Sequence, residues 1–224
     1  MISGAPTVMA AIDPPRGIYV SCLKRLADVV ISGPLAVVLA PVMLAVAVAV
    51  WLVLGAPVLH RDTRAGRFGQ PITLFKFRSM REALAADGSP LPDAERLGPF
   101  GWFLRRTSLD ELPQLYNVLG GDMSLVGPRP LPERYVPRYS ARQATRLLVR
   151  PGITGWAQIH GRNSVDWPER LEYDARYVEI LRGPWAAIAD LWIMAATVVQ
   201  WFSQAATGRG IAAPGSATAH EFQP

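Results

Sequence analysis

Residues 29–59 contain no charged side chain, and this run restricts the possible folds more than any other feature of the sequence. A stretch of about 20 apolar residues is long enough to cross the hydrocarbon core of a bilayer. The run is about twice as long as the apolar core of a secretory signal. Asp13, Pro14 and Pro15 precede it, which also argues against a cleaved leader. The sequence therefore predicts a membrane segment that stays in the mature protein.

Both flanks of this segment are basic. Arg16, Lys24 and Arg25 precede it, and Arg61, Arg64, Arg67, Lys76 and Arg78 follow it. Because basic flanks tend to stay on the cytoplasmic side, a straight span would carry one flank across the bilayer, whereas a hairpin carries neither. Pro34 and Pro41 each remove a helix amide, which permits a break. We therefore predict a re-entrant helix-break-helix over residues 21–59, joined near Pro41 and with Trp51 near an interface. One tilted, kinked span is the alternative.

A second apolar stretch covers residues 185–202. Asp190 and Gln200 interrupt it, and three tryptophans are spread along it, so it is a poor span. Tryptophan favours the headgroup region, and an amphipathic helix lying in the interface is one interpretation. A buried core helix explains the same pattern. An exposed aromatic face here also leaves a homodimer open.

The remaining sequence predicts a small domain that is mainly α with a short β element. Helices are expected over residues 101–106, 112–119, 132–148, 167–180 and 185–202, and a short strand pair at residues 71–77. Residues 83–97 are rich in turn-forming types and are expected to form a surface loop. The chain would then divide into a flexible N-terminal arm (1–20), the re-entrant membrane helix (21–59), a cytoplasmic domain with interfacial amphipathic helices (60–206) and a flexible tail (207–224).

The charge balance favours an anionic partner. Lys and Arg number 23 and Asp and Glu 18, and the resulting net charge of +5 suits phosphate groups, nucleic acid or acidic lipid headgroups. Zinc-finger spacing, a P-loop, a dinucleotide-binding glycine pattern and a His-Glu-x-x-His motif are absent from the sequence, so no nucleic-acid binding is predicted. The single Cys22 excludes an intramolecular disulfide and fits a reducing cytoplasm.

Two adjacent carboxylates, Asp110 and Glu111, follow Arg105 and Arg106 and precede an apolar helical run. They are expected to start a helix, either with Asp110 as the N-cap or with a capping box from Ser108 to Glu111. The positive helix end and the arginines would then lower the pKa of both carboxyls. An ionised aspartate can act as a nucleophile, and ordinary helix capping is the alternative.

Arginines in rigid or glycine-rich turns are candidates for phosphate contact. Arg129 lies between two prolines that fix its backbone, as bidentate phosphate recognition requires, although an exposed arginine in a structural turn explains the same pattern. The turns at residues 150–158 and 161–163 add further arginines, among them Arg162, and backbone amides that could hold phosphate. Asp174 could reach a metal or a sugar, but a solvated helix face is the favoured interpretation.

The order of these segments matches a known family. In sequence come Lys24-Arg25 with Asp28, the proline-containing apolar run, Lys76-Phe77-Arg78-Ser79-Met80, Ser108-Leu109-Asp110-Glu111-Leu112, Gly127-Pro128-Arg129-Pro130 and Arg150-Pro151-Gly152-Ile153-Thr154-Gly155-Trp156. Over residues 20–200 the chain resembles the bacterial sugar transferase family and, more narrowly, the small monotopic polyprenyl-phosphate phosphoglycosyl transferases. One departure is Ala40 before Pro41, where the family generally has a serine whose hydroxyl can satisfy a freed backbone group.

The resemblance implies an enzyme that transfers a sugar 1-phosphate from a UDP-sugar to polyprenyl phosphate and releases UMP, as the first membrane step of glycoconjugate or exopolysaccharide synthesis. It implies Mg²⁺ as cofactor, Asp110 as the nucleophile that carries a covalent phosphosugar, and Glu111 as its catalytic partner, with both carboxylates as metal ligands. Basic family positions expected to contact phosphate are matched by Lys76, Arg105, Arg129 and Arg162. Residues 60–206 would form the catalytic domain on the cytoplasmic face of the bacterial inner membrane, in contact with membrane lipids. A non-catalytic membrane scaffold and a hydrolase of nucleotide sugars are the alternatives.

Overall fold

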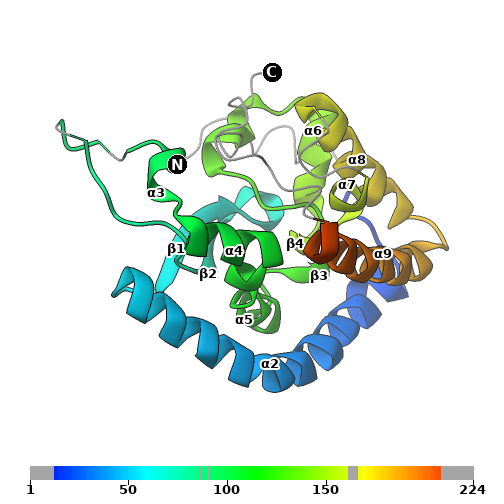
Figure 1. Cartoon of the computed structure of the whole chain (residues 1–224). Coiled ribbons are helices and arrows are strands. Elements are labelled where there is room, and N and C mark those ends of the chain that lie inside the picture. The colour runs from blue at the N-terminus through cyan, green and yellow to red at the C-terminus, as the bar shows by residue number, and fades with distance from the viewer. Residues whose placement is uncertain (1–12, 86, 90, 161–165, 208–224) are drawn as a thin grey trace.

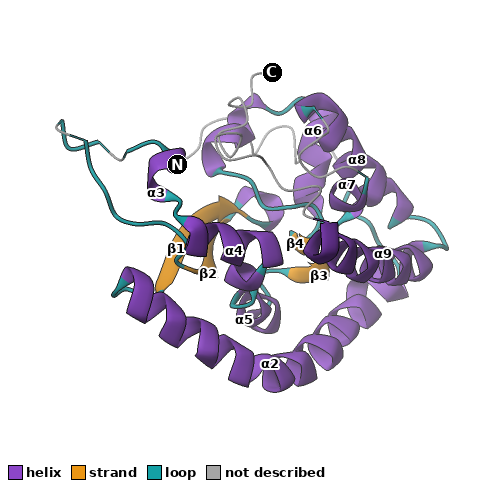
Figure 2. Cartoon of the chain, viewed as in Figure 1, coloured by secondary structure: helices purple, strands orange, loops and turns teal. Residues whose placement is uncertain are grey.

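The computed structural model describes residues 13–85, 87–89, 91–160 and 166–207 (Figure 1). This part is mostly helical and contains two small two-stranded sheets (Figure 2), so the prediction of a mainly α fold with a short β element is confirmed. The arm expected at residues 1–20 and the tail expected at 207–224 lie largely outside the described residues, and Arg162 lies outside them too.

The elements have the following bounds. The α-helices are α2 (Lys24–Leu54), α3 (Asp93–Arg96), α4 (Pro99–Thr107), α5 (Gln114–Gly120), α6 (Ala141–Ala144), α7 (Trp156–Ile159), α8 (Trp167–Ile180) and α9 (Ala186–Thr207). The strands are β1 (Leu59–Ala65), β2 (Pro71–Phe77), β3 (Ser124–Val126) and β4 (Gly152–Thr154). A π-helical turn η1 (Tyr19–Leu23) precedes α2, and 3₁₀ turns are η2 (Arg67–Gly69), η3 (Leu109–Glu111), η4 (Glu133–Arg138) and η5 (Thr145–Leu148).

The apolar run forms α2, one helix that continues through Pro34 and Pro41 and bends in its middle part (Figure 1). Proline is a usual cause of such a bend, because it removes a backbone hydrogen bond and crowds the preceding turn. The two separate helices expected on either side of Pro41 are therefore one bent helix. By length and composition, Tyr19–Leu54 and Ala186–Ser203 are candidate membrane spans, which indicates membrane association.

Both long apolar helices bury one face and expose the other. Met43, Val46 and Val50 of α2 pack against Phe77 of β2 and Leu104 of α4. Exposed side chains of α2 include Leu26, Val30, Val37, Val38, Leu44, Leu52 and Val53, and those of α9 include Ile188, Leu191, Trp192, Val198 and Val199. Ile193 of α9 is fully buried, so one face of this helix belongs to the core. Exposed apolar faces of this size fit membrane association.

Buried polar groups fix the start of α2 to the rest of the chain. Asp28 accepts a hydrogen bond from Ser124 Oγ of β3 over 3.0 Å. Lys24 Nζ lies 2.5 Å from the carboxylate of Asp190 in α9, and the hydroxyl of Tyr177 donates to the same carboxylate over 2.7 Å. Asp190, which only interrupted an apolar stretch in the sequence, is therefore the ion-pair partner of α2.

The other end of α2 is capped by Arg78, which directly follows β2. Its guanidinium donates to the carbonyl oxygens of Leu54, Gly55 (2.6 Å) and Ala56 (3.2 Å). These acceptors lie where a helix end leaves carbonyls without intrahelical partners. The membrane helix is therefore joined directly to the strand that carries Lys76.

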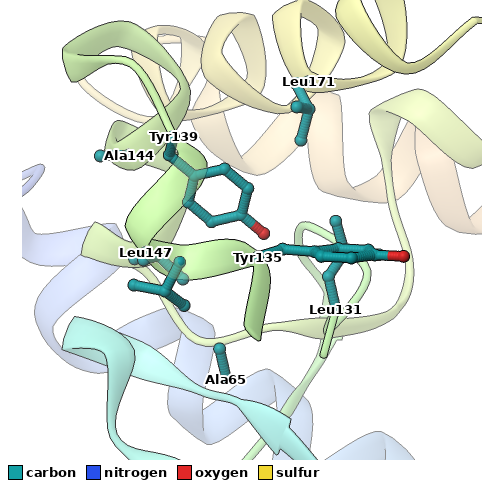
Figure 3. Close-up of a cluster of buried hydrophobic side chains, with 8 residues drawn as sticks. Ala65, Leu131, Tyr135, Tyr139, Ala144, Leu147 and Leu171 are labelled. Atoms are coloured by element: carbon teal, nitrogen blue, oxygen red, sulfur yellow. The ribbon is translucent and has the colours of Figure 1, made fainter. Parts of the chain in front are cut away.

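Residues 71–77, where a short strand pair was predicted, form the single strand β2, which pairs with β1 in an antiparallel hairpin. Helices α4, α5, α8 and α9 lie where helices were predicted. The single helix expected over residues 132–148 is wrong. The chain there forms η4, α6 and η5, because Pro137 lies inside η4 and Ser140 starts a new helix with a capping box to Gln143. These short pieces pack with β1 and α8 around Tyr139, Leu147 and Leu171 (Figure 3). The expected surface loop at 83–97 also contains the short helix α3.

Candidate active site

Asp110 lies in η3, the single turn between α4 and α5. α4 ends at Thr107, and the following Ser108 has a left-handed φ of 55° that redirects the chain. Leu109 and Leu112, on either side of the two carboxylates, pack into the apolar cluster that includes Val46 and Val50 of α2. The packing of these two leucines therefore fixes the carboxylates beside the membrane helix.

Helix α4 approaches the segment after β2 closely. A Cβ at Gly101 would lie 1.8 Å from the carbonyl oxygen of Ser79, so glycine is required at this crossing. The hydroxyl of Ser79 accepts a hydrogen bond from Arg105 Nε over 3.1 Å. Arg105 is thereby held at the end of α4 that leads into η3.

Glu111 and Arg129 form the central ion pair of the site. Both terminal nitrogens of Arg129 donate to the carboxylate of Glu111, one of them over 3.2 Å to Oε2. A bidentate arginine of this kind suits either a carboxylate or a phosphate. Lys76 Nζ of β2 lies 4.0 Å from Glu111 Oε1. Three of the predicted site residues therefore lie together: Lys76 of β2, Glu111 of η3 and Arg129 of the loop after β3.

Burial raises the pKa of Asp110 to about 7, and the neighbouring Glu111 carboxylate adds to the rise. The charges of Lys76, Arg105 and Arg129 oppose it. The lowered pKa expected from the sequence is therefore wrong, because desolvation of a residue that is 8 % exposed outweighs the nearby cations. The expected helix caps are also wrong, since α5 begins without a side-chain cap. Burial likewise lowers the pKa of Lys76.

The model of the bacterial sugar transferase family matches residues 19–204. This chain belongs to that family. The matched range includes helix α2 and the segments that surround Asp110.

Several relatives of this sugar transferase carry descriptive names. An uncharacterised sugar transferase of Bacillus subtilis, EpsL, is 46 % identical over 176 residues, which make up 79 % of this chain and 85 % of that protein. A UDP-glucose:undecaprenyl-phosphate glucose-1-phosphate transferase of Klebsiella pneumoniae is 40 % identical over 212 residues, or 90 % of this chain and 44 % of that protein. An undecaprenyl-phosphate galactose phosphotransferase of Salmonella typhimurium is 39 % identical, covering 70 % of this chain and 36 % of its own length. The chain thus spans less than half of the last two relatives.

The glycine-rich segments of this sugar transferase pair its backbone strands. The amide of Gly127 donates to Thr154 O over 2.8 Å, and that of Gly152 donates to Pro128 O over 3.0 Å. The prediction that backbone amides at residues 150–158 hold phosphate is therefore wrong for Gly152, whose N–H is already used. The parallel pair β3–β4, which the sequence did not predict, sets the position of the loop that carries Arg129.

Asp174 of the sugar transferase does not lie on a solvated face, and the favoured prediction for it is wrong. It is 2 % exposed and lies 2.9 Å from Arg146 Nη2. Helical spacing contained the signal for this burial, because Asp174 shares a face of α8 with the buried Leu171 and Val178. No pattern in the sequence singled out Arg146 as its partner.

The carboxylates fit a magnesium ion that is bound together with a substrate. Within the described ranges, no group of three or more His, Cys, Asp or Glu side chains lies close enough to hold a metal. Magnesium is commonly held through one or two carboxylates and the oxygens of substrate phosphates. Asp110 and Glu111 are adjacent oxygen donors, and the Glu111 side chain is 20 % exposed. Phosphate oxygens would have to supply further ligands.

Proposed function

We propose that this sugar transferase moves a sugar 1-phosphate from a UDP-sugar to polyprenyl phosphate at the cytoplasmic face of the bacterial inner membrane, with release of UMP. The observation that carries this proposal is the position of the Asp110–Glu111 turn, which packs on the long apolar helix α2 and lies among Lys76, Arg105 and Arg129. A polyprenyl phosphate presents its phosphate at the boundary between lipid and water. The names of the Klebsiella and Salmonella relatives support the same chemistry.

The proposed reaction has two halves. First, a carboxylate oxygen of Asp110 attacks the phosphorus that carries the sugar, the bond from that phosphorus to the bridging oxygen breaks, and UMP leaves with the electron pair. Then an oxygen of polyprenyl phosphate attacks the same phosphorus, the bond to Asp110 breaks, and the polyprenyl diphosphate sugar is formed. Because the carboxylate is regenerated, donor and acceptor use the site in turn.

The charges of the site address the main obstacle to this reaction, which is repulsion between a carboxylate and a diphosphate. Lys76 and Arg129 are placed to bind phosphate oxygens as charge develops on them. Arg129 holds Glu111 through the same two nitrogens that would bind a phosphate, so an incoming diphosphate would compete for Arg129 and release Glu111. Asp110 and Glu111 would then hold magnesium, which supplies neutralisation of the diphosphate charge.

The test is an assay of the purified full chain in detergent with Mg²⁺, undecaprenyl phosphate and a panel of UDP-sugars, with UMP as the readout. With at least one donor, UMP should be released in equal amount to the lipid-linked product. With the donor alone, UMP release should stop at about one equivalent of enzyme, as a burst. Continuous release without the lipid would indicate a hydrolase. Normal glycan synthesis in a strain carrying only Asp110→Asn would indicate a scaffold.

Removal of divalent cations should stop this transfer. We expect excess EDTA to lower the rate of UMP release by at least about 100-fold, because metal stabilisation of transferring phosphoryl groups is worth several kcal/mol. Added Mg²⁺ in excess of the chelator should restore the rate. The unfolding temperature of the protein without donor, measured in parallel, separates loss of cofactor from loss of fold. A full rate in EDTA would contradict the proposed metal.

We also propose that α2 is re-entrant. Both of its ends contact the same folded domain, since Lys24 pairs with Asp190 and Arg78 caps Leu54 and Gly55. Figure 1 shows α2 curving along one side of that domain. A bent helix attached at both ends to one domain needs only one side of the bilayer.

Cysteine labelling tests this topology. Cys22 and Gln70 are both exposed, and Cys22 precedes α2 in the sequence whereas Gln70 follows it. The substitution Gln70→Cys therefore provides a second labelling site. A membrane-impermeant maleimide should label both cysteines in inside-out vesicles and neither in intact cells. The Cys22→Ser protein, with and without Gln70→Cys, assigns each signal. Labelling of the two positions from opposite sides would establish the tilted span instead.

A further inference from the structure

We infer that Arg146 and Asp174 are positioning residues for Arg129: a buried ion pair that holds the backbone of Arg129 so that its side chain meets Glu111. This inference rests on the proposed function, in which Arg129 binds first Glu111 and then the donor diphosphate. Neither residue touches the reacting atoms in the proposed reaction, and both act through Arg129.

Arg146 uses all three of its guanidinium nitrogens inside the protein. Nε lies 3.0 Å and Nη2 2.9 Å from Asp174 Oδ2. Nη1 donates to the hydroxyl of Tyr139 over 3.0 Å, and Nη2 donates to the backbone carbonyl of Arg129 over 2.6 Å. Arg146 is 3 % exposed. The guanidinium therefore links Tyr139, which directly follows η4, to α8 and to the Arg129 loop.

The Arg129 loop is held from two sides. On one side, the amide of Gly127 donates to β4 and the carbonyl of Pro128 accepts from Gly152, over 2.8 and 3.0 Å. On the other side, the carbonyl of Arg129 accepts from Arg146. Pro128 and Pro130 have no amide hydrogen to donate, so carbonyl oxygens must carry much of the anchoring here. Arg146 supplies the anchor that is closest to the side chain of Arg129.

The surrounding core keeps Arg146 in place. Tyr139, Leu147 and Leu171 belong to one buried cluster, and Figure 3 shows the ring of Tyr139 between Leu147 and Leu171. Arg146 immediately precedes Leu147 in η5, and Asp174 lies one helical turn after Leu171 in α8. Both charged side chains therefore come from segments whose backbones the apolar cluster fixes.

Stability alone does not explain a charged pair at this position. Apolar residues of similar volume are often equally stabilising, because they avoid the desolvation of two ions. A guanidinium adds a fixed direction, since its planar donors can hold a carboxylate, a hydroxyl and a carbonyl at once. Groups that bind a reacting phosphate need such support, because a displacement of about 1 Å weakens a bidentate contact substantially.

A double-mutant cycle tests the inference. Arg129→Ala should lower kcat/KM for the UDP-sugar, measured in the donor-only burst, by about 100-fold, and Arg146→Lys should lower it by about 10-fold. Lysine keeps the charge but loses the planar fork. If Arg146 acts through Arg129, the double variant should be no slower than Arg129→Ala, within about 2-fold. Asp174→Asn changes the other residue of the ion pair, and it should show the same coupling to Arg129→Ala.

Asp190→Asn is the matched control, because Asp190 is another buried aspartate in an ion pair, with Lys24. It should lower the unfolding temperature, and its effect on the burst should multiply with that of Arg129→Ala. If the decreases in kcat/KM caused by Arg146→Lys and Arg129→Ala multiply in the double variant, the inference is overturned. The inference is also overturned if Asp190→Asn couples to Arg129→Ala as strongly as Arg146→Lys does, because that result would indicate general destabilisation.

A second readout does not depend on turnover. The ¹⁵N NMR signal of the Arg129 guanidinium can be assigned by its loss in Arg129→Ala. In the protein without donor, this signal should shift or broaden in Arg146→Lys and stay unchanged in Asp190→Asn. An unchanged signal in Arg146→Lys would overturn the positioning role whatever the activity. If wild-type protein releases no UMP with any donor but the signal shifts as expected, the proposed function fails and the positioning role stands.

Discussion

Asp110→Asn should lower sugar-phosphate transfer by at least about 1,000-fold, because an amide has no carboxylate oxygen with which to attack phosphorus. The change is nearly isosteric. Burial already favours the uncharged form of Asp110, whose pKa is raised to about 7, so a neutral amide should be tolerated. We therefore expect an unfolding temperature at or above that of the wild type. The measurement is the initial rate of UMP release with both substrates present.

Covalent trapping sharpens this prediction. With labelled UDP-sugar and Mg²⁺ but no lipid, wild-type protein should retain about one equivalent of label, and Asp110→Asn should retain none. Asp122→Asn is the matched control, because Asp122 is an exposed aspartate just after α5 and should behave as wild type. Turnover by Asp110→Asn at more than about a tenth of the wild-type rate would show that no bond to this side chain is needed.

The sequence was sufficient to predict those features that depend on local pattern. A run of 31 residues without charge indicated the membrane helix, counted from 29 to 59. Apolar residues interleaved with Thr73 and Lys76 located β2, and helical patterns located α4 and α8, to within a few residues. Asp110, Glu111, Lys76 and Arg129 were identified together because each lies in a short motif, and the structure brings the last three into one ion-pair cluster.

The features that the sequence did not predict depend on burial by distant segments. The pKa of Asp110 is raised, whereas the sequence predicted a lowered pKa. The reason is that Leu109 and Leu112 pack the turn against α2, which removes water from the Asp110 carboxyl. Arg146 and Asp174 are 28 positions apart, and no local pattern connects them. The three-residue strands β3 and β4 are too short for alternation to reveal them, although they set the Arg129 loop.

Asp190 shows the same effect in the membrane-associated part of the chain. In sequence it is one charge in an apolar helix, whereas in the structure it accepts hydrogen bonds from Lys24, Tyr19 and Tyr177. The side chains of Lys24 and Asp190 are only 11 % and 4 % exposed. The pair therefore attaches the first turn of α2 to α9, and through α2 it supports the surface on which the Asp110 turn packs.

Asp190→Ala should lower the free energy of unfolding by about 3–5 kcal/mol, because it leaves the buried ammonium group of Lys24 and the hydroxyl of Tyr19 without their acceptor, while Tyr177 keeps the carbonyl of Val126. Thermal or denaturant unfolding in detergent measures the loss. Asp122→Ala, which removes an exposed carboxylate, should change stability by no more than about 0.5 kcal/mol. Lys24→Met combined with Asp190→Leu should recover much of the loss, since neither charge of this pair then remains. If Asp190→Ala unfolds like the wild type, the ammonium group of Lys24 reaches water or lipid headgroups without this partner, and the attachment of α2 to α9 must have another source.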